Sequence, residues 1–140
     1  MDKVLIDSGP MIALFDGSDK YHKVSVEFIK NNTAELLTTL ASITETLHLL
    51  GFSRHAQADF LQWIYSGAIK IENISSRDFQ DIAQMMLKYT DLPMDFADAC
   101  LVFIADKFKI DTIATIDRDF DIYRLKKKKT FTTLIDPKPR

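Results

Sequence analysis

The sequence predicts a three-layer α/β/α sandwich around a central, mainly parallel sheet of four or five strands. Three observations carry this prediction. Short apolar runs alternate with amphipathic stretches along the chain, two of these runs stop at an aspartate, and 46% of the 140 residues are hydrophobic. Alternating strands and helices favour a parallel sheet covered on both faces. This length fits one domain, so we expect residues 1–140 to fold as a single unit.

In the first half of the chain, a strand is expected at residues 3–7, where a short apolar run stops at Asp7. Ser8 and Pro10 follow directly, and both residue types favour a helix start. The hydrophobic pattern then predicts, in order, helices at 8–15 and 21–31, a strand at 35–38, and helices at 40–50 and 53–66.

The second half is expected to add three strands and two helices. A third strand is predicted at 69–74, and an amphipathic helix follows at 76–89. Residues 95–108 form the most apolar predicted helix. The last two strands are expected at 112–116, which stops at Asp117, and at 131–134, on the edge of the sheet.

The charge is unevenly distributed. Residues 1–117 hold 10 Lys and Arg against 17 Asp and Glu, whereas residues 118–140 hold 8 against 3. An acidic body with a basic C-terminal segment, 122–140, is not typical of a protein that coats nucleic acid. Cys100 is the only cysteine, which excludes an internal disulfide, and the start of the chain lacks a signal-peptide pattern. We therefore expect a cytoplasmic protein without a membrane segment.

Four acidic residues stand out by position. Asp7 and Asp117 end predicted strands, Glu45 lies in a helix among apolar residues, and Asp98 lies inside the most apolar helix. Ligands of parallel sheets bind beyond the carboxyl ends of the strands. A buried carboxylate is costly unless a cation or hydrogen bonds compensate it, and converging carboxylates raise one another's pKa. A hard divalent cation, Mg²⁺ or Mn²⁺, is the simplest solution.

Each acid also has a plainer interpretation, which the sequence leaves open. Asp7 could cap the following helix, Glu45 could be a solvated helix position, and Asp117 could be a turn residue. For Asp98 a function is favoured over a capping role, because it lies a turn inside its helix. The four together are a stronger signal than any one of them.

The motifs occur in a recognisable order. They are Asp7-Ser8-Gly9-Pro10 after a strand, the helical Glu45, Asp95-Phe96-Ala97-Asp98-Ala99, and Thr115-Ile116-Asp117-Arg118-Asp119-Phe120. This arrangement resembles the PIN-domain nucleases, and among them the VapC-type toxins of toxin–antitoxin pairs. The resemblance extends over nearly the whole chain, and it implies a PIN-like fold.

The resemblance further implies an endoribonuclease that depends on one or two Mg²⁺ or Mn²⁺ ions. Asp7, Asp98 and Asp117 correspond to the metal ligands, and Glu45 to a residue that either ligates metal or orients the attacking water. In-line attack by water on the scissile phosphate would leave a 3′-hydroxyl and a 5′-phosphate. The implied partners are an RNA substrate, a cognate antitoxin and a second copy of the chain.

Further positions are expected to support the site. Ser8 and Thr115 match small polar positions of the family, whereas Asp95 and Asp119 are additional acids that either ligate metal or shape the surroundings. Basic side chains near the C-terminus could guide the RNA backbone, or they could form a solvated tail; they are Arg118, Arg124, Lys126 and Lys127. The helical hairpin over 40–66 could offer a groove for an antitoxin segment or for a second copy.

Other classes of site fit the sequence less well. An EF-hand is excluded because Ile122 replaces its glycine and Lys128 its glutamate, and an aspartyl-phosphate phosphatase because Gly9 replaces the second acid. Two alternatives stay open. One is a structure-specific DNA nuclease, and the other is a catalytically silent PIN-like domain that only binds a partner.

Overall fold

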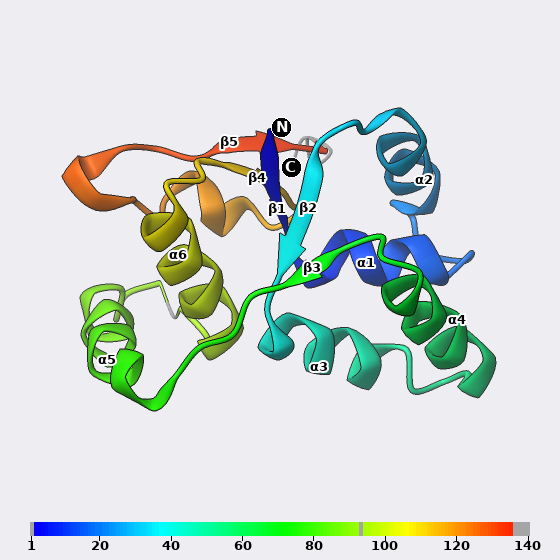
Figure 1. Ribbon diagram of the computed structural model, residues 1–140, viewed down its shortest axis with the longest axis horizontal. Coiled ribbons are helices and arrows are strands. Elements are labelled where there is room, and N and C mark those ends of the chain that lie inside the picture. Colours follow the sequence, from blue (N-terminus) through cyan, green and yellow to red (C-terminus); the bar gives the residue numbers. More distant parts are fainter. Residues whose placement is uncertain (1, 93, 136–140) are drawn as a thin grey trace.

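A five-stranded sheet between two layers of helices forms the protein (Figure 1), in a computed structural model that describes residues 2–92 and 94–135. The strands are β1 (Lys3–Ile6), β2 (Glu35–Thr38), β3 (Lys70–Ile71), β4 (Thr112–Ala114) and β5 (Thr132–Leu134). They lie in the order β3-β2-β1-β4-β5, and each pair of neighbours is parallel. The predicted fold class is confirmed, with the strand nearest the C-terminus at one edge.

The helices cover both faces of this sheet, as Figure 1 shows. On one side lie α1 (Ser8–Phe15), α2 (His22–Asn31) and α4 (Arg54–Tyr65), and on the other lie α5 (Phe79–Lys88) and α6 (Phe96–Phe108). Helix α3 (Leu40–Leu49) follows β2 directly and runs past the carboxyl ends of the central strands. The carboxyl edge of the sheet is therefore bordered by α1, α3 and α6.

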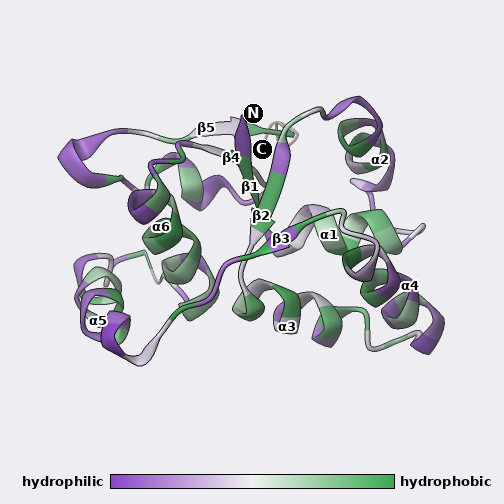
Figure 2. Cartoon of the chain, in the orientation of Figure 1, coloured by the Kyte–Doolittle hydropathy of each residue, from purple (hydrophilic) through white to green (hydrophobic). Residues whose placement is uncertain are grey.

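Two apolar cores, one on each face of the sheet, hold the layers together. Phe60 of α4 and Met11 of α1 belong to the first core, whereas Leu101 of α6, Phe120 and Tyr123 belong to the second. Figure 2 shows the complementary pattern: β2 is largely hydrophobic, and hydrophilic residues gather on α5 and in the turn before β5. Burial of these side chains fixes the positions of the elements that carry the acids.

Side-chain caps start the helices that border the carboxyl edge. Asp7 caps α1, Thr39 caps α3 and Asp95 caps α6, each by accepting a hydrogen bond from a backbone N–H of the first turn. Gly9 allows α1 to approach the loop after β4, because a Cβ atom there would lie 2.7 Å from Cγ1 of Ile116. This close approach brings the ends of β1 and β4 together.

The structure departs from the sequence prediction at several element ends. β3 is shorter than the predicted strand because only Lys70 and Ile71 pair with β2 at the sheet edge. Residues 76–78 form a 3₁₀ turn before α5, where the backbone N–H of Ser75 donates to Asp78 Oδ2 at 3.0 Å. Asp95 precedes α6 as its cap instead of belonging to it.

The predicted basic segment 122–140 is described as far as Ile135, and its last five residues lie outside the described part of the chain. Among the helices of residues 2–92 and 94–135, none combines the length and the apolar character needed to cross a bilayer.

Candidate metal centre

Three carboxylates from three different elements converge at the carboxyl edge of the sheet. Asp7 follows β1, Asp117 lies in the loop after β4, and Asp98 lies in the first turn of α6. One oxygen of each lies within 4.8 Å of the other two. Together with Glu45 they line a pocket of about 330 Å³, called here the acid pocket. Because β1 and β4 pair in parallel, the residues that follow both strands meet there.

Asp7 is held on both oxygens. Its Oδ1 accepts from the backbone N–H of Ser8 at 2.8 Å, and its Oδ2 accepts from the hydroxyl of Thr115 at 3.0 Å. Only 4% of Asp7 is exposed. Burial raises the pKa of Asp7 to about 7, although both hydrogen bonds act in the opposite direction. The carboxylate therefore has a fixed orientation and an environment that disfavours its charge.

Asp98 is the second buried acid, with 7% of its surface exposed. Its Oδ2 accepts a 2.9 Å hydrogen bond from the hydroxyl of Tyr123. Burial, followed by the charges of Asp7 and Asp95, raises the pKa of Asp98 to about 8. Sequence reasoning missed Tyr123, because a tyrosine 25 residues away from its partner leaves no local spacing pattern.

Asp117 is oriented through the turn that follows β4. Its backbone N–H donates to Thr115 Oγ1 at 2.9 Å, so one threonine hydroxyl connects Asp117 with Asp7. Asp117 Oδ1 accepts from the backbone N–H of Asp119 at 2.9 Å. Partial burial raises the pKa of Asp117, and the nearby carboxylate of Asp119 adds to this effect. Asp119 thus shapes the turn and adds negative charge beside the pocket.

Glu45, Ser8 and Asp95 line the pocket together with the three aspartates. Glu45 lies in the middle of α3, and its Oε1 accepts a hydrogen bond from the Ser8 hydroxyl. Asp95 Oδ1 accepts from the backbone N–H of Asp98 at 2.8 Å, which makes Asp95 the cap of α6 as well as a wall of the pocket. The bond between Ser8 and Glu45 thus connects α1 with α3, whereas the bond of Asp95 stays within the start of α6.

The basic residues predicted to contact RNA lie in two places. Arg118 directly follows Asp117, in a 3₁₀ turn formed by Arg118–Asp121. Arg124 donates through Nη1 to the backbone carbonyls of Asp121, at 2.7 Å, and of Ile122, at 2.8 Å. Lys126 and Lys127 are exposed in the turn before β5, well apart from the start of α1 (Figure 1). None of these four predicted RNA-binding residues lines the acid pocket.

The donor set fits a hard divalent cation. All the potential ligand atoms are carboxylate oxygens, which Mg²⁺ and Mn²⁺ prefer. The causes that raise the pKa of Asp98 include three neighbouring carboxylates, and a bound cation would offset this repulsion. Within the described residues, Asp7, Asp98 and Asp117 are the one group of three acidic, histidine or cysteine side chains close enough to share an ion.

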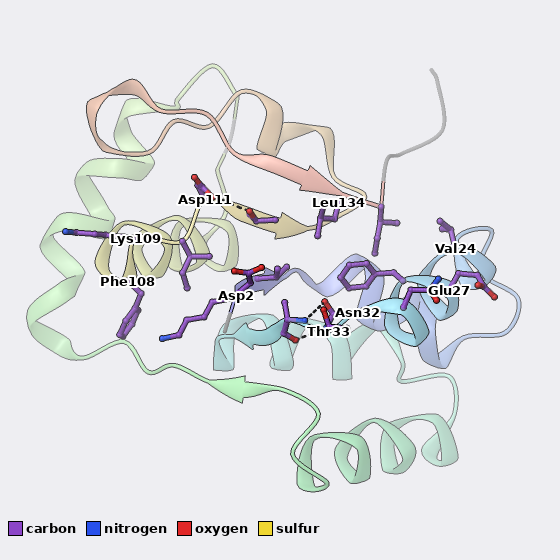
Figure 3. A pocket seen from close by; sticks show the side chains of 17 residues that line it. Asp2, Val24, Glu27, Asn32, Thr33, Phe108, Lys109, Asp111 and Leu134 are labelled. Carbon is purple, nitrogen blue, oxygen red and sulfur yellow. Dashed lines mark hydrogen bonds between the residues drawn. The ribbon is translucent and has the colours of Figure 1, made fainter.

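A larger cavity, of about 850 Å³, lies at the opposite, amino edge of the sheet (Figure 3). Residues that precede β1, β2 and β4 line it, among them Asp2, Asn32 and Asp111. Figure 3 shows that the acidic side chains of Asp2, Glu27 and Asp111 are spread around this cavity instead of converging. Volume alone therefore does not identify the place where acids could hold a metal.

Comparison with known proteins agrees with the fold. Ribonuclease VapC26 of Mycobacterium tuberculosis is 26% identical over 117 residues, which cover 82% of this chain and 87% of that protein. The crystal structure of Mycobacterium tuberculosis VapC20, a toxin that cleaves the sarcin-ricin loop, matches with a TM-score of 0.78 at 16% identity, covering 85% of this chain and 93% of that one. The PIN domain family matches residues 4–126, a range that contains Asp7, Glu45, Asp98 and Asp117, and the chain therefore belongs to the PIN domain family.

Proposed function

We propose that this protein is an endoribonuclease that uses Mg²⁺ or Mn²⁺ to hydrolyse RNA phosphodiester bonds, and that it is the toxin of a toxin–antitoxin pair. The observation that carries the proposal is the convergence of Asp7, Asp98 and Asp117. The names of its relatives support the choice of RNA, because one is called a ribonuclease and the other a toxin that cleaves the sarcin-ricin loop.

In this proposal Asp7, Asp98 and Asp117 hold the cation. A bound divalent cation supplies Lewis-acid polarisation of a phosphodiester and lowers the pKa of water. Thr115 and Tyr123 keep the ligand oxygens of Asp7 and Asp98 in place through their hydroxyl groups. Such outer hydrogen bonds fix ligand orientation and increase metal affinity.

Glu45 is the residue we assign to the attacking water. It lines the same pocket as the three aspartates, and its bond with Ser8 holds one carboxylate oxygen toward α1. The carboxylate can orient a water molecule and accept its proton. Because water and not the ribose 2′-hydroxyl attacks, the products carry a 3′-hydroxyl and a 5′-phosphate.

Arg118 is the basic residue best placed to meet RNA at the site, because it directly follows Asp117. The exposed lysines before β5 lie farther away, so they would attract the RNA backbone at a distance from the cleaved bond. We further propose that residues 1–140 act as one domain, and that the antitoxin and a second copy of the chain are its protein partners.

The test is cleavage of RNA by the purified protein with and without Mn²⁺, followed by analysis of the product ends. We expect metal-dependent cleavage that yields 5′-phosphates and that is lost in Asp98→Asn. Asp59→Asn is the matched control, because Asp59 is an exposed aspartate of α4. Cleavage that proceeds equally in Asp98→Asn would contradict the proposal.

A DNA oligonucleotide of the same sequence separates the proposal from the DNA-nuclease alternative. We expect RNA to be cut and DNA to be spared. If neither is cut although the protein binds Mn²⁺, a catalytically silent domain that binds a partner becomes the better interpretation.

A further inference from the structure

A second pocket, about 440 Å³ in volume, is lined by α3 and α6, two of the helices that border the acid pocket, and by the start of α5. Helix α3 contributes Leu40 to this second pocket and Glu45 to the acid pocket. Helix α6 likewise contributes Phe96 to the second pocket and Asp98 to the acid pocket. The two pockets are therefore lined by different residues of the same two helices. Glu45 follows Leu40 by five positions, which is about 7.5 Å along the axis of α3.

The second pocket is lined by uncharged side chains and carries an exposed aromatic pair. Phe79 starts α5 and Phe96 starts α6, with ring centroids 5.7 Å apart and ring planes inclined by 54°. Phe79 is 51% and Phe96 41% exposed, and Leu40 beside them is 56% exposed. Exposed apolar side chains gathered around a pocket in this way are typical of surfaces that bind a ligand or another macromolecule.

Asn73 adds a polar group to the lining. Its amide offers both hydrogen-bond donors and an acceptor, which can pair with the edge of a nucleobase. Aromatic rings provide the stacking surface on which unpaired bases of RNA are bound. The chemistry of the pocket, with aromatic faces, one amide and no charged lining residue, is thus complementary to a nucleobase and not to a phosphate.

We propose that this pocket, called here the base pocket, binds a nucleobase of the RNA strand whose phosphodiester lies in the acid pocket. The proposal rests on the proposed function and adds a binding site for one unpaired base of the RNA. A base held in a duplex cannot enter, because its faces are already stacked and its edge is paired.

The test uses fluorescence anisotropy with short, labelled single-stranded oligouridylate and oligoadenylate, with Ca²⁺ present to neutralise the acids and the oligonucleotides checked for integrity. We expect Phe96→Leu to bind the tighter of the two about tenfold more weakly, because leucine fills the space but offers no ring. Phe96→Tyr keeps the ring and is expected to bind like the wild type. Tyr65→Leu is the matched control, since Tyr65 is an aromatic residue of α4 with 85% exposure outside the base pocket.

An abasic oligonucleotide sharpens the test. One base is removed at each position of the oligonucleotide in turn. At the position whose base occupies the pocket, the removal should weaken binding to the wild type by about the same factor as Phe96→Leu does. The same removal should weaken binding to Phe96→Leu much less. Phe79→Leu removes the other ring of the pair and serves as a second variant. Thermal unfolding shows whether each variant is folded, and weaker oligonucleotide binding by one folded variant is sufficient to support the base pocket.

Three results would overturn the base pocket. The first is wild-type affinity in folded Phe96→Leu and Phe79→Leu, and the second is failure of the wild type to bind either oligonucleotide. The third is dissociation of a wild-type dimer by Phe96→Leu in sedimentation, which would make the pocket a contact between copies of the chain. If the wild type still cleaves RNA with Mn²⁺, the proposed function survives any of these results, whereas absent cleavage counts against the proposed function itself.

Discussion

The acidic side chains at the amino edge and at the carboxyl edge of the sheet have different partners and opposite pKa shifts. At the amino edge, Asp111 has a cationic partner, because Lys129 Nζ lies 2.7 Å from its Oδ2. This contact lowers the pKa of Asp111 below its usual value. At the carboxyl edge, burial and neighbouring carboxylates raise the pKa of Asp7 and of Asp98. The larger cavity thus surrounds acids that are dispersed or paired, and the smaller pocket collects acids whose charge still needs compensation.

The largest expected effect comes from removing one acid at each edge. Asp98→Asn should lower RNA cleavage by roughly a thousandfold, because a metal ligand contributes several kcal/mol of transition-state stabilisation. Asp111→Asn should leave the rate unchanged. Initial rates of RNA cleavage with Mn²⁺ measure the effect of each substitution. Equal losses of rate in Asp98→Asn and Asp111→Asn would contradict the distinction between the two edges.

The second prediction concerns pH. Because the pKa of Asp7 is raised to about 7 and that of Asp98 to about 8, the folded state binds more protons than the unfolded state above about pH 4. Without metal, the free energy of unfolding should therefore fall as pH rises from about 5 to about 8. Mn²⁺ should restore stability mainly at the upper end, where the acids are free to ionise.

Urea unfolding in EDTA and in Mn²⁺ measures this dependence. The decrease of the free energy of unfolding with pH should be smaller in Asp98→Asn. It should stay unchanged in Asp111→Asn, because the pKa of Asp111 is lowered and this group titrates below the pH range of the experiment. A stability that rises with pH in EDTA, and loses that rise in Asp98→Asn, would contradict the burial argument.

A smaller effect is expected from Tyr123→Phe. The ring packs edge-on against Tyr89 and Phe120 and should stay in place, but Asp98 Oδ2 loses its hydrogen bond. Loss of an outer partner of a metal ligand lowers metal affinity by roughly tenfold or more. Calorimetric titration with Mn²⁺ measures this affinity. An unchanged affinity in Tyr123→Phe would show that Tyr123 does not support metal binding.

The smallest effect is expected at the amino edge. Lys129→Ala removes the partner of Asp111, but the two side chains are 63% and 41% exposed. Such surface pairs contribute less than about 1 kcal/mol to the free energy of unfolding. Chemical unfolding should therefore show little change, and RNA cleavage at low salt shows separately whether this lysine also attracts the substrate.

The sequence was sufficient to predict the fold and the meeting place of the acids, for identifiable reasons. Asp7 and Asp117 each follow an apolar run, and parallel topology brings the ends of such runs to one edge. Asp98 is conspicuous because its helix is otherwise so apolar. These signals are local, so a single sequence displays them.

The remaining features depend on contacts between distant residues. Neither the bond from Tyr123 to Asp98 nor the pairing of Phe79 with Phe96 leaves a local pattern. The short β3 is determined by how far its neighbour β2 can pair with it. The amphipathic pattern of residues 76–89 does not distinguish the initial 3₁₀ turn from the helix that follows.

The central claim is that the carboxyl edge, and not the amino edge, holds a divalent cation. Its most direct test is calorimetric titration of Mn²⁺ into the wild type, Asp98→Asn and Asp111→Asn. We expect binding to the wild type and to Asp111→Asn, and strongly weakened binding to Asp98→Asn. Equal binding to all three proteins, or loss of binding in Asp111→Asn alone, would contradict the account.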